Sequence, residues 1–308
     1  MLLNGVESRM KLAMIRTGEA NAATTPHLAL VEEDRVLDVT VLAEGAGWAA
    51  SVLALIEGGQ QALAQLRAVV TSAPDDAWRP LDRVRFLAPI PRPPKNVFCV
   101  GKNYMEHIAE GQRVWSELGD RPSAPVVFTK AHTAIIGPGD TIRKPANTAS
   151  LDYEGELAVV IGKGGRGITA DKAHEHVFGY MLLNDVTARD LQKRGPQWFL
   201  GKSCDTFCPT GPWIALADPA VPQPDFEIRV SVNDEERQRF RTSEMLFTIA
   251  EIIEEISRNI TLEPGDIIAT GTGPGCGFAL DPPRFLQVGD TVVVEAEGLG
   301  RLANTVGE

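Results

Sequence analysis

Three acidic residues alternate in the sequence DYEGE at 152–156, just before the apolar run 157–161. If this stretch is a strand, alternate side chains share one face, so Asp152, Glu154 and Glu156 lie together. Like charges this close repel one another, and a hard divalent cation such as Mg²⁺, Mn²⁺ or Ca²⁺ relieves the repulsion because these ions prefer oxygen ligands. The competing interpretation is an exposed edge strand with an acidic outer face. The apolar continuation favours a central strand.

A second group of polar residues follows the apolar run 180–183. Asp185 closes this run, and Arg189 and Gln192 share one face if a helix begins near residue 187. A guanidinium group binds a carboxylate through two parallel hydrogen bonds, so Arg189 is a candidate for holding an acidic substrate. The alternative is an ordinary helix start with a surface arginine.

His107 and Glu110 are three residues apart in the sequence YMEHIAE. On a short helix they can hydrogen-bond, and a carboxylate that holds one imidazole nitrogen leaves the other free to take a proton from water. The pair is therefore a candidate for acid/base chemistry. Such a pair on a protein surface, without function, is the competing interpretation.

Two glycine-rich segments suggest nucleotide binding without meeting its requirements. Residues 162–167 match G-x-G-x-x-G, and Asp185 lies near the offset that a dinucleotide site needs, so a nicotinamide-binding oxidoreductase is a rival hypothesis. The preceding strand carries the acidic residues, however, and the glycines are typical of a turn. In 271–277 four glycines allow close approach of a ligand, and Thr272 can hydrogen-bond a carboxylate. This segment lacks the Lys-Ser/Thr ending of a phosphate loop, and the chain has no G-x-S-x-G motif.

Composition excludes several classes of protein. The 308 residues carry a net charge of −11, which argues against a sequence-independent nucleic-acid binder. No stretch approaches the ~18 apolar residues of a membrane helix. The first residues lack the basic and apolar segments of a signal peptide. Four cysteines are too few for a disulfide scaffold. We therefore expect a cytoplasmic protein with reduced cysteines and without a membrane partner.

The elements that must position these residues fall into two units. Prolines 89, 91, 93 and 94 predict a linker, because proline neither continues a helix nor donates to a strand ladder. We predict a small N-terminal domain at 1–90, with a helix at 51–66, and a catalytic domain at 91–308. The second contains short strand patterns separated by Gly and Pro, with a helix at 245–258, so the expected class is α+β and mainly β. The expected strands are 11–15, 27–31, 36–41, 97–100, 126–129, 153–161, 180–184, 228–232, 267–270 and 291–295.

Taken in order, the motifs resemble those of the fumarylacetoacetate hydrolase family. The resemblance covers essentially all of residues 91–308. The matching pieces are YMEHIAE at 104–110, DYEGEL at 152–157, NDVTARDLQ at 184–192, QWFLGKSCDTF at 197–207 and TGTG at 270–273. Each piece alone is weak, but five in this order are specific.

The resemblance implies a role for each matching residue. Glu154, Glu156 and Asp185 would hold Mg²⁺ or Mn²⁺, with Ca²⁺ as a substitute and no nucleotide. The remaining roles concern the substrate: His107 and Glu110 as the acid/base pair, Lys202 as the group that stabilises developing negative charge, and Arg189, Gln192 and Thr272 as substrate contacts. An acidic ligand that the name-giving enzyme takes from its N-terminal side has no counterpart that we could identify. The resemblance also implies a mixed, mostly β roll and a homodimer.

The chemistry implied is cleavage of a small anionic 2-oxo acid. The sequence favours metal-dependent hydrolysis of the C–C bond of an acylpyruvate, such as the fumarylpyruvate or maleylpyruvate of aromatic catabolism, because His107 and Glu110 could activate water. Decarboxylation of oxaloacetate, or isomerase or dehydratase chemistry on a 2-oxo acid, is the alternative on the same core. A non-catalytic metal-binding protein would keep the acids but would have no use for His107 and Lys202.

Overall fold

A large mixed sheet runs through the computed structural model, which describes residues 10–18, 25–114 and 121–308. Within these residues the sheet has twelve strands in the order β4-β3-β2-β1-β14-β12-β11-β17-β6-β7, with β5 beside β1 and β8 beside β14. Most neighbours pair antiparallel, whereas β17 with β6 and β14 with β8 pair parallel. The bounds are β1 Lys11–Thr17, β2 His27–Glu32, β3 Arg35–Asp38, β4 Trp78–Pro80, β5 Val84–Leu87, β6 Val97–Gly101, β7 Val126–Lys130, β8 Ile135–Ile136, β11 Gly155–Ile161, β12 Val177–Asn184, β14 Cys208–Leu216 and β17 Ile267–Ala269.

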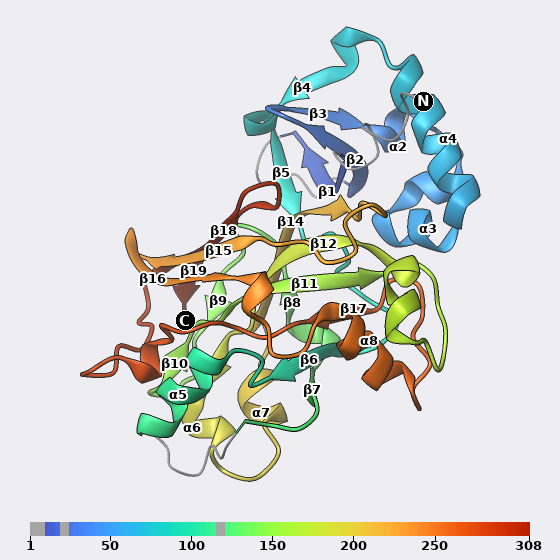
Figure 1. The fold of residues 1–308 in the computed structure, drawn as a ribbon. Coiled ribbons are helices and arrows are strands. Elements are labelled where there is room, and N and C mark those ends of the chain that lie inside the picture. Colours follow the sequence, from blue (N-terminus) through green and yellow to red (C-terminus); the bar gives the residue numbers. More distant parts are fainter. Residues whose placement is uncertain (1–9, 19–24, 115–120) are drawn as a thin grey trace.

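Two smaller sheets and several short helices complete the described part of the chain (Figure 1). The five-stranded sheet has the order β16-β15-β18-β19-β9, and β10 pairs with β13. The strand bounds are β9 Ile142–Arg143, β10 Leu151–Asp152, β13 Thr187–Ala188, β15 Glu227–Val232, β16 Glu235–Arg241, β18 Thr291–Ala296 and β19 Gly300–Gly307. The helices are α2 Val39–Leu42, α3 Val52–Glu57, α4 Gly59–Ser72, α5 Met105–Val114, α6 Arg189–Gln192, α7 Phe199–Lys202 and α8 Ile249–Ser257. The predicted α+β, mainly β class is confirmed.

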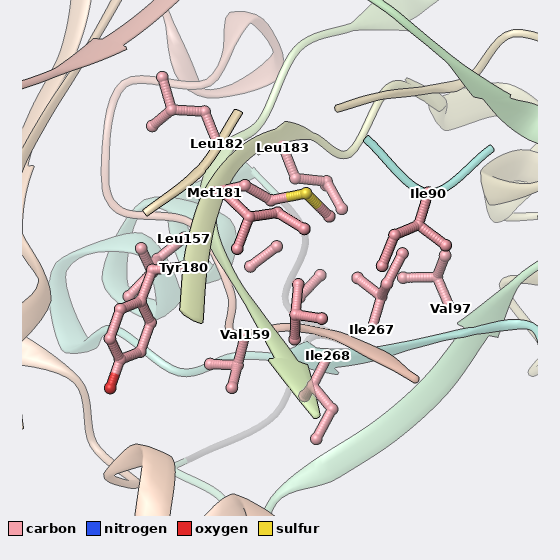
Figure 2. Close-up of a cluster of buried hydrophobic side chains, with 14 of the residues drawn as sticks. Ile90, Val97, Leu157, Val159, Tyr180, Met181, Leu182, Leu183, Ile267 and Ile268 are labelled. Carbon is pink, nitrogen blue, oxygen red and sulfur yellow. The ribbon is translucent and has the colours of Figure 1, made fainter. Parts of the chain in front are cut away.

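The central strands are buried on both faces. Every residue of β11 is buried, because β12 and β17 flank it in the sheet and side chains pack on both sides. Figure 2 shows Leu157 and Val159 of β11 among the apolar side chains of the neighbouring strands. Burying one Val, Leu or Ile stabilises the fold by about 1.5–3 kcal/mol, so this core fixes β11 and β12 firmly. The acidic residues at the ends of these strands therefore stand on a rigid base.

The antiparallel pairing of β11 with β12 argues against a dinucleotide-binding site at residues 162–167. A dinucleotide site needs two parallel strands joined through a helix after the glycine-rich turn. Residues 162–167 instead belong to the connection between two antiparallel strands, with Gly155 opposite Asn184 and Val160 opposite Gly179. The nicotinamide-binding hypothesis for this segment is therefore wrong, and the glycines serve a turn.

Two predicted helices differ from the observed ones for local reasons. The helix expected at 51–66 is divided into α3 and α4 at Gly58, and Gly59 has a φ of +59°. The helix expected from residue 245 begins at Ile249, because Thr248 caps it by accepting from the Glu251 N–H at 3.3 Å.

The predicted boundary after residue 90 is crossed by a strand ladder. Strand β1 pairs with β14, with Lys11 opposite Ala215 and Leu12 opposite Ile214. The N-terminal strands thus extend the large sheet, and the division into two domains stays a prediction. Residues 1–9, the start of the predicted N-terminal domain, lie outside the described residues. None of the described helices has the length and apolar character needed to cross a membrane.

Candidate metal centre and pocket

The ends of β11 and β12 bring three carboxylates together. Glu154 directly precedes β11, Glu156 is its second residue, and Asp185 directly follows β12. The antiparallel register places Asp185 beside Glu154, where the Asp185 N–H donates to the Glu154 carbonyl at 2.8 Å. All three side chains are buried, and one carboxylate oxygen of each lies within 4.8 Å of the other two. The sequence-predicted metal ligands therefore share one site.

Gly155, between the two glutamates, allows a second sheet to approach. A Cβ at this position would lie 2.3 Å from Cγ2 of Val230 on β15, so any other residue would displace that side chain. The N–H of Gly155 donates to the Gln238 side chain of β16 at 3.0 Å. The glycine thus fixes the backbone from which both glutamates project.

Two of the three carboxylates are balanced by buried cations. The Lys202 ammonium lies 2.6 Å from Oε2 of Glu154 and 2.6 Å from Oδ2 of Asp185. Lys130 donates to the other oxygen of Asp185 at 2.5 Å, and Arg189 Nη2 lies 2.6 Å from Oε1 of Glu154. Burial alone would raise the pKa of Glu154, but Lys202 and Arg189 hold that pKa below its ordinary value. Burial alone would lower the pKa of Lys202, but Asp185 and Glu154 raise it, so Lys202 stays charged.

Glu156 is the carboxylate whose charge the protein leaves unbalanced. Within the described part of the chain no lysine or arginine forms an ion pair with it, and its Oε2 accepts only from the backbone N–H of Gly271 at 2.8 Å. Burial, and next the charges of Asp185 and Glu154, raise its pKa well above the usual 4.5. A divalent cation would supply the missing positive charge to a donor set made entirely of oxygens, which fits Mg²⁺ or Mn²⁺. Which ion binds stays a prediction.

Asp152 does not join this cluster, contrary to the simple alternation of the strand. It ends β10 before the break that precedes β11, and its carboxylate accepts from Arg189 Nε at 2.8 Å and from the N–H groups of Gly277 and Phe278 at 2.8 and 3.2 Å. Its charge is thus paired with Arg189. The sequence could not show this arrangement, because the partners of Asp152 lie 37 and 125 residues away along the chain.

Arg189 and Gln192 lie together as predicted, but Arg189 already binds carboxylates of the protein. Its Nη1 donates to the Gln192 side chain at 3.3 Å, and its guanidinium contacts Asp152 and Glu154 and lies 4.4 Å from the centre of the Phe278 ring. Carboxylate oxygens of Asp152 and Glu154 thus already bind the guanidinium nitrogens of Arg189 that were expected to bind a substrate carboxylate. A substrate would have to compete with them, so the substrate contact of Arg189 stays a prediction.

His107 and Glu110 both lie on α5 but do not hydrogen-bond to each other. The Glu110 carboxylate accepts from the backbone N–H of Gly275 at 2.9 and 3.1 Å, whereas His107 Nδ1 lies 3.8 Å from Sγ of Cys276. The predicted orientation of His107 by Glu110 is therefore wrong for this structure. Burial of the ring, together with the nearby Arg189 and Lys202, lowers the pKa of His107 to about 4, against the opposing effect of Glu154. The imidazole is thus neutral at pH 7 and able to accept a proton.

Thr272 lies in the same region with its hydroxyl already engaged. It donates to the Gly155 carbonyl at 2.8 Å and accepts from Gln238 Nε2 at 2.9 Å. Its role therefore includes holding the backbone between the two glutamates. Gln238 was missed from the sequence because it lies on β16, a strand whose composition (EERQRFR) gives no strand signal.

One pocket joins most of the predicted site residues. It holds about 560 Å³ of empty space, part of it open to solvent. Its walls include the aromatic rings of Phe128 on β7, of Trp198 directly before α7, and of Phe278. The ring centres of Phe128 and Trp198 are 5.3 Å apart. The predicted site residues that line it are His107, Glu154, Glu156, Asp185, Arg189, Gln192, Lys202 and Thr272. Of the predicted site residues, only Glu110 does not line this pocket.

Lys130 is a positioning residue that the sequence analysis missed. It ends β7, and its side chain and that of Asp185 are both 0% exposed. A lysine that closes a partly apolar strand was the available signal, but its partner could not be inferred without the fold. Breaking a buried ion pair leaves an uncompensated charge, so Lys130→Met should lower the free energy of unfolding by about 3–5 kcal/mol. Urea denaturation measures this change.

A surface pair gives the matched control. Arg258 lies 3.0 Å from Glu255, with side chains 60% and 36% exposed. Arg258→Met should cost about 0–1 kcal/mol, because exposed pairs contribute little. A Lys130→Met variant no less stable than this control would contradict the anchoring of Asp185 by Lys130.

Comparison with known proteins places the site in context. The family model described as "Fumarylacetoacetate (FAA) hydrolase C-terminal" matches residues 96–307. The chain is 47% identical over 229 residues to the oxaloacetate tautomerase YisK of Bacillus subtilis (strain 168), covering 74% of each chain. It is 43% identical over 259 residues to the mitochondrial oxaloacetate tautomerase FAHD2A of Bos taurus, covering 83% of this chain and 79% of that one.

Solved structures agree with these matches. A fumarylacetoacetate hydrolase from psychrophilic Exiguobacterium antarcticum superposes with a TM-score of 0.79 at 41% identity, covering 97% of this chain and 99% of that chain. A maleylpyruvate hydrolase from Sphingobium sp. SYK-6 superposes with a TM-score of 0.76 at 30% identity, covering 97% and 99%.

Proposed function

Because the chain belongs to the fumarylacetoacetate hydrolase family, we propose that it is a metal-dependent isomerase that interconverts the keto and enol forms of oxaloacetate. The observation that carries the proposal is the buried set Glu154, Glu156 and Asp185, with one unbalanced charge, in the same pocket as a neutral His107 and a charged Lys202. The relatives named as oxaloacetate tautomerases support this choice of reaction and substrate.

The reaction needs one proton removed from C3 and one added to O2. When bound, the divalent cation would draw electron density from the carboxylate and the 2-oxo group of the substrate. His107, neutral at pH 7, accepts the C3 proton, and the electron pair of the C–H bond becomes the C2=C3 double bond. Negative charge moves to O2, where the Lys202 ammonium stabilises it before a proton from solvent completes the enol. His107 then releases its proton to solvent, which balances the proton taken up at O2. In the reverse reaction O2 loses its proton to solvent and protonated His107 donates a proton to C3.

Hydrolysis of an acylpyruvate, the activity first expected from the motifs, is the second candidate. The solved maleylpyruvate hydrolase is the observation that favours it. The structural feature behind that expectation is missing here, because Glu110 binds Gly275 instead of orienting His107 toward water. Proton transfer to and from carbon needs no such orientation of water, so the geometry suits tautomerisation better. The role in aromatic catabolism, the homodimer and the cytoplasmic location stay predictions.

A spectroscopic assay tests the proposal. Oxaloacetate enol absorbs in the ultraviolet, and its conversion to the keto form is followed against a buffer blank, since the reaction also runs slowly without a catalyst. The metal-free protein should not exceed the blank, and added Mn²⁺ or Mg²⁺ should restore a rate that chelator removes. Parallel assays for pyruvate release from oxaloacetate and for loss of an acylpyruvate separate decarboxylation and hydrolysis. No acceleration of tautomerisation with either ion would refute the proposal.

A further inference from the structure

A second group of ligand-type side chains adjoins the three carboxylates. Cys276, His107 and Glu154 each offer one ligand atom, and these atoms lie within 4.8 Å of one another. His107 Nδ1 is 3.8 Å from Cys276 Sγ. The mechanism above uses the imidazole of His107 but gives the thiol of Cys276 no role. The set thus combines nitrogen, sulfur and oxygen, whereas the neighbouring set contains oxygen alone.

The chemistry of the two sets differs in the ions that each prefers. Mg²⁺ and Ca²⁺ bind oxygen and avoid thiolate, whereas Zn²⁺ binds cysteine, histidine and carboxylate together. Tetrahedral Zn²⁺ with bonds of ~2.05 Å to nitrogen and ~2.3 Å to sulfur places these two ligand atoms about 3.5 Å apart. The observed 3.8 Å between Nδ1 and Sγ is close to this value. The geometry therefore suits a borderline-soft ion with a small side-chain adjustment.

Hydrogen bonds of the surrounding residues hold His107 and Cys276 next to each other. Glu110, one turn after His107 on α5, accepts from the Gly275 N–H, which ties this helix to the segment that carries Cys276. Gln238 Nε2 donates to the Gly273 carbonyl at 3.0 Å and lies 3.6 Å from Cys276 Sγ. His107 and Cys276 thus meet through contacts that do not involve the carboxylate cluster.

We infer that His107, Cys276 and Glu154 form a second cation site, selective for Zn²⁺ over Mg²⁺, that shares Glu154 with the carboxylate set. Binding forms an S–Zn bond and releases the thiol proton to solvent. A zinc ion has to compete for Glu154 with two cations, Arg189 Nη2 at Oε1 and Lys202 Nζ at Oε2, each 2.6 Å away. Three protein ligands leave the fourth tetrahedral position to water.

The consequence for activity rests on the proposed function. An ion that binds the His107 ring removes the proton acceptor, and its use of Glu154 competes with the hard cation. Zn²⁺ should therefore inhibit the Mg²⁺-supported reaction at concentrations far below those of Mg²⁺. The site would make the enzyme sensitive to free zinc.

Cobalt substitution tests the site without reference to activity. Co²⁺ bound to a cysteine thiolate gives a charge-transfer band in the near ultraviolet, whereas Co²⁺ on oxygen ligands does not. The full-length, metal-free protein titrated with Co²⁺ should show this band, and Zn²⁺ should abolish it. Cys276→Ser should lack the band, and Cys204→Ser, the matched control at a partly exposed cysteine, should keep it. A missing band in the unmodified protein, or a band that persists in Cys276→Ser, overturns the inference.

Two further measurements keep the test decisive. If Cys276→Ser does not fold, His107→Gln answers the same question, because loss of one ligand should weaken Co²⁺ binding by about tenfold or more; unchanged binding overturns the site. In the activity assay, the Zn²⁺ concentration that halves each protein's own Mg²⁺-supported rate should rise at least about tenfold in Cys276→Ser and stay unchanged in Cys204→Ser. A thiolate band without tautomerase activity refutes the proposed function alone, whereas activity without the band refutes the zinc site alone.

Discussion

Replacing Glu156 with glutamine is expected to lower the metal-supported tautomerisation of oxaloacetate about a thousandfold. The Lewis-acid contribution of a bound divalent cation is worth several kcal/mol, and each 1.4 kcal/mol corresponds to about a factor of ten in rate. Glutamine keeps the size of the side chain and can still accept from the Gly271 N–H, so the backbone contact is retained. The loss should therefore come from weaker cation binding, measured as a higher Mn²⁺ concentration needed for half-maximal rate.

The same substitution should have the opposite effect on the stability of the metal-free protein. Glu156 is buried without an ion-pair partner among the described residues, and removing an unpaired buried charge relieves a cost. We expect Glu156→Gln to unfold at the same or a higher temperature than the unmodified protein when both are metal-free. With Mn²⁺ at about one hundred times its Kd, the unmodified protein gains about 2.7 kcal/mol and the variant gains almost nothing, so the order of stability reverses.

Glu154→Gln is the matched control, two residues away on the same hairpin. Glu154 balances Lys202 and Arg189, so its neutralisation leaves buried cations short of a partner. The metal-free protein should lose about 3–5 kcal/mol in this variant, in contrast to Glu156→Gln. Thermal unfolding of the three metal-free proteins side by side gives the comparison. Equal destabilisation by both substitutions would show that Glu156 serves packing and would remove the argument for an unbalanced charge.

The two strands that carry the acids could be predicted because their signals are local. The apolar run 157–161 predicts a buried strand, and Glu154 and Glu156 alternate on one face as period two requires. Asp185 also follows an apolar strand, so its place at a strand end could be read directly. The register that puts Asp185 beside Glu154 could not be predicted from the sequence. The connection between β11 and β12 has 15 residues and carries no hairpin signal.

Strands β14 and β16 were not predicted, because their sequences lack the features typical of a strand. Strand β14 contains Pro209, Gly211 and Pro212, yet it pairs with β1, β12 and β8. Proline weakens a central strand because it cannot donate to the ladder, so tertiary packing decides here. Strand β16 is charged and half exposed, and its one buried amide, Gln238, contacts the site. Such residues can be found only once the sheets are in place.

The roles of individual side chains were least accessible. The spacing of His107 and Glu110 predicted a mutual hydrogen bond, but residue 275, far along the chain, supplies a better donor to the Glu110 carboxylate. Asp152 was grouped with the metal ligands by alternation, but a break between β10 and β11 turns it toward Arg189. In both cases a long-range partner displaces a local one. Sequence spacing shows which contacts are possible, and the tertiary structure determines which of them form.

Replacing His107 with glutamine is expected to lower kcat for tautomerisation by about 10²–10⁴, the range that a positioned acid/base group contributes. Glutamine retains polarity and approximate size but cannot take up the C3 proton. The carboxylates that would hold the cation are contacted by Lys130, Lys202 and Arg189 rather than by His107, so KM and the Mn²⁺ requirement should change little. Exchange of the C3 proton of oxaloacetate for deuterium, followed by proton NMR, measures the step in which His107 acts.

Glu110→Gln separates the two accounts of how His107 works. In the structure Glu110 ties α5 to Gly275 and forms no hydrogen bond with the His107 ring. Its loss should therefore lower the exchange rate by about tenfold or less, mainly through looser placement of the helix. If His107 were instead oriented by Glu110 for activation of water, both substitutions would reduce turnover equally. A Glu110→Gln variant as impaired as His107→Gln in C3 exchange would therefore restore the hydrogen-bonded pair and count against the geometry described here. A much larger loss in His107→Gln than in Glu110→Gln follows if His107 is the proton acceptor and is kept neutral at pH 7 by burial and the nearby Arg189 and Lys202.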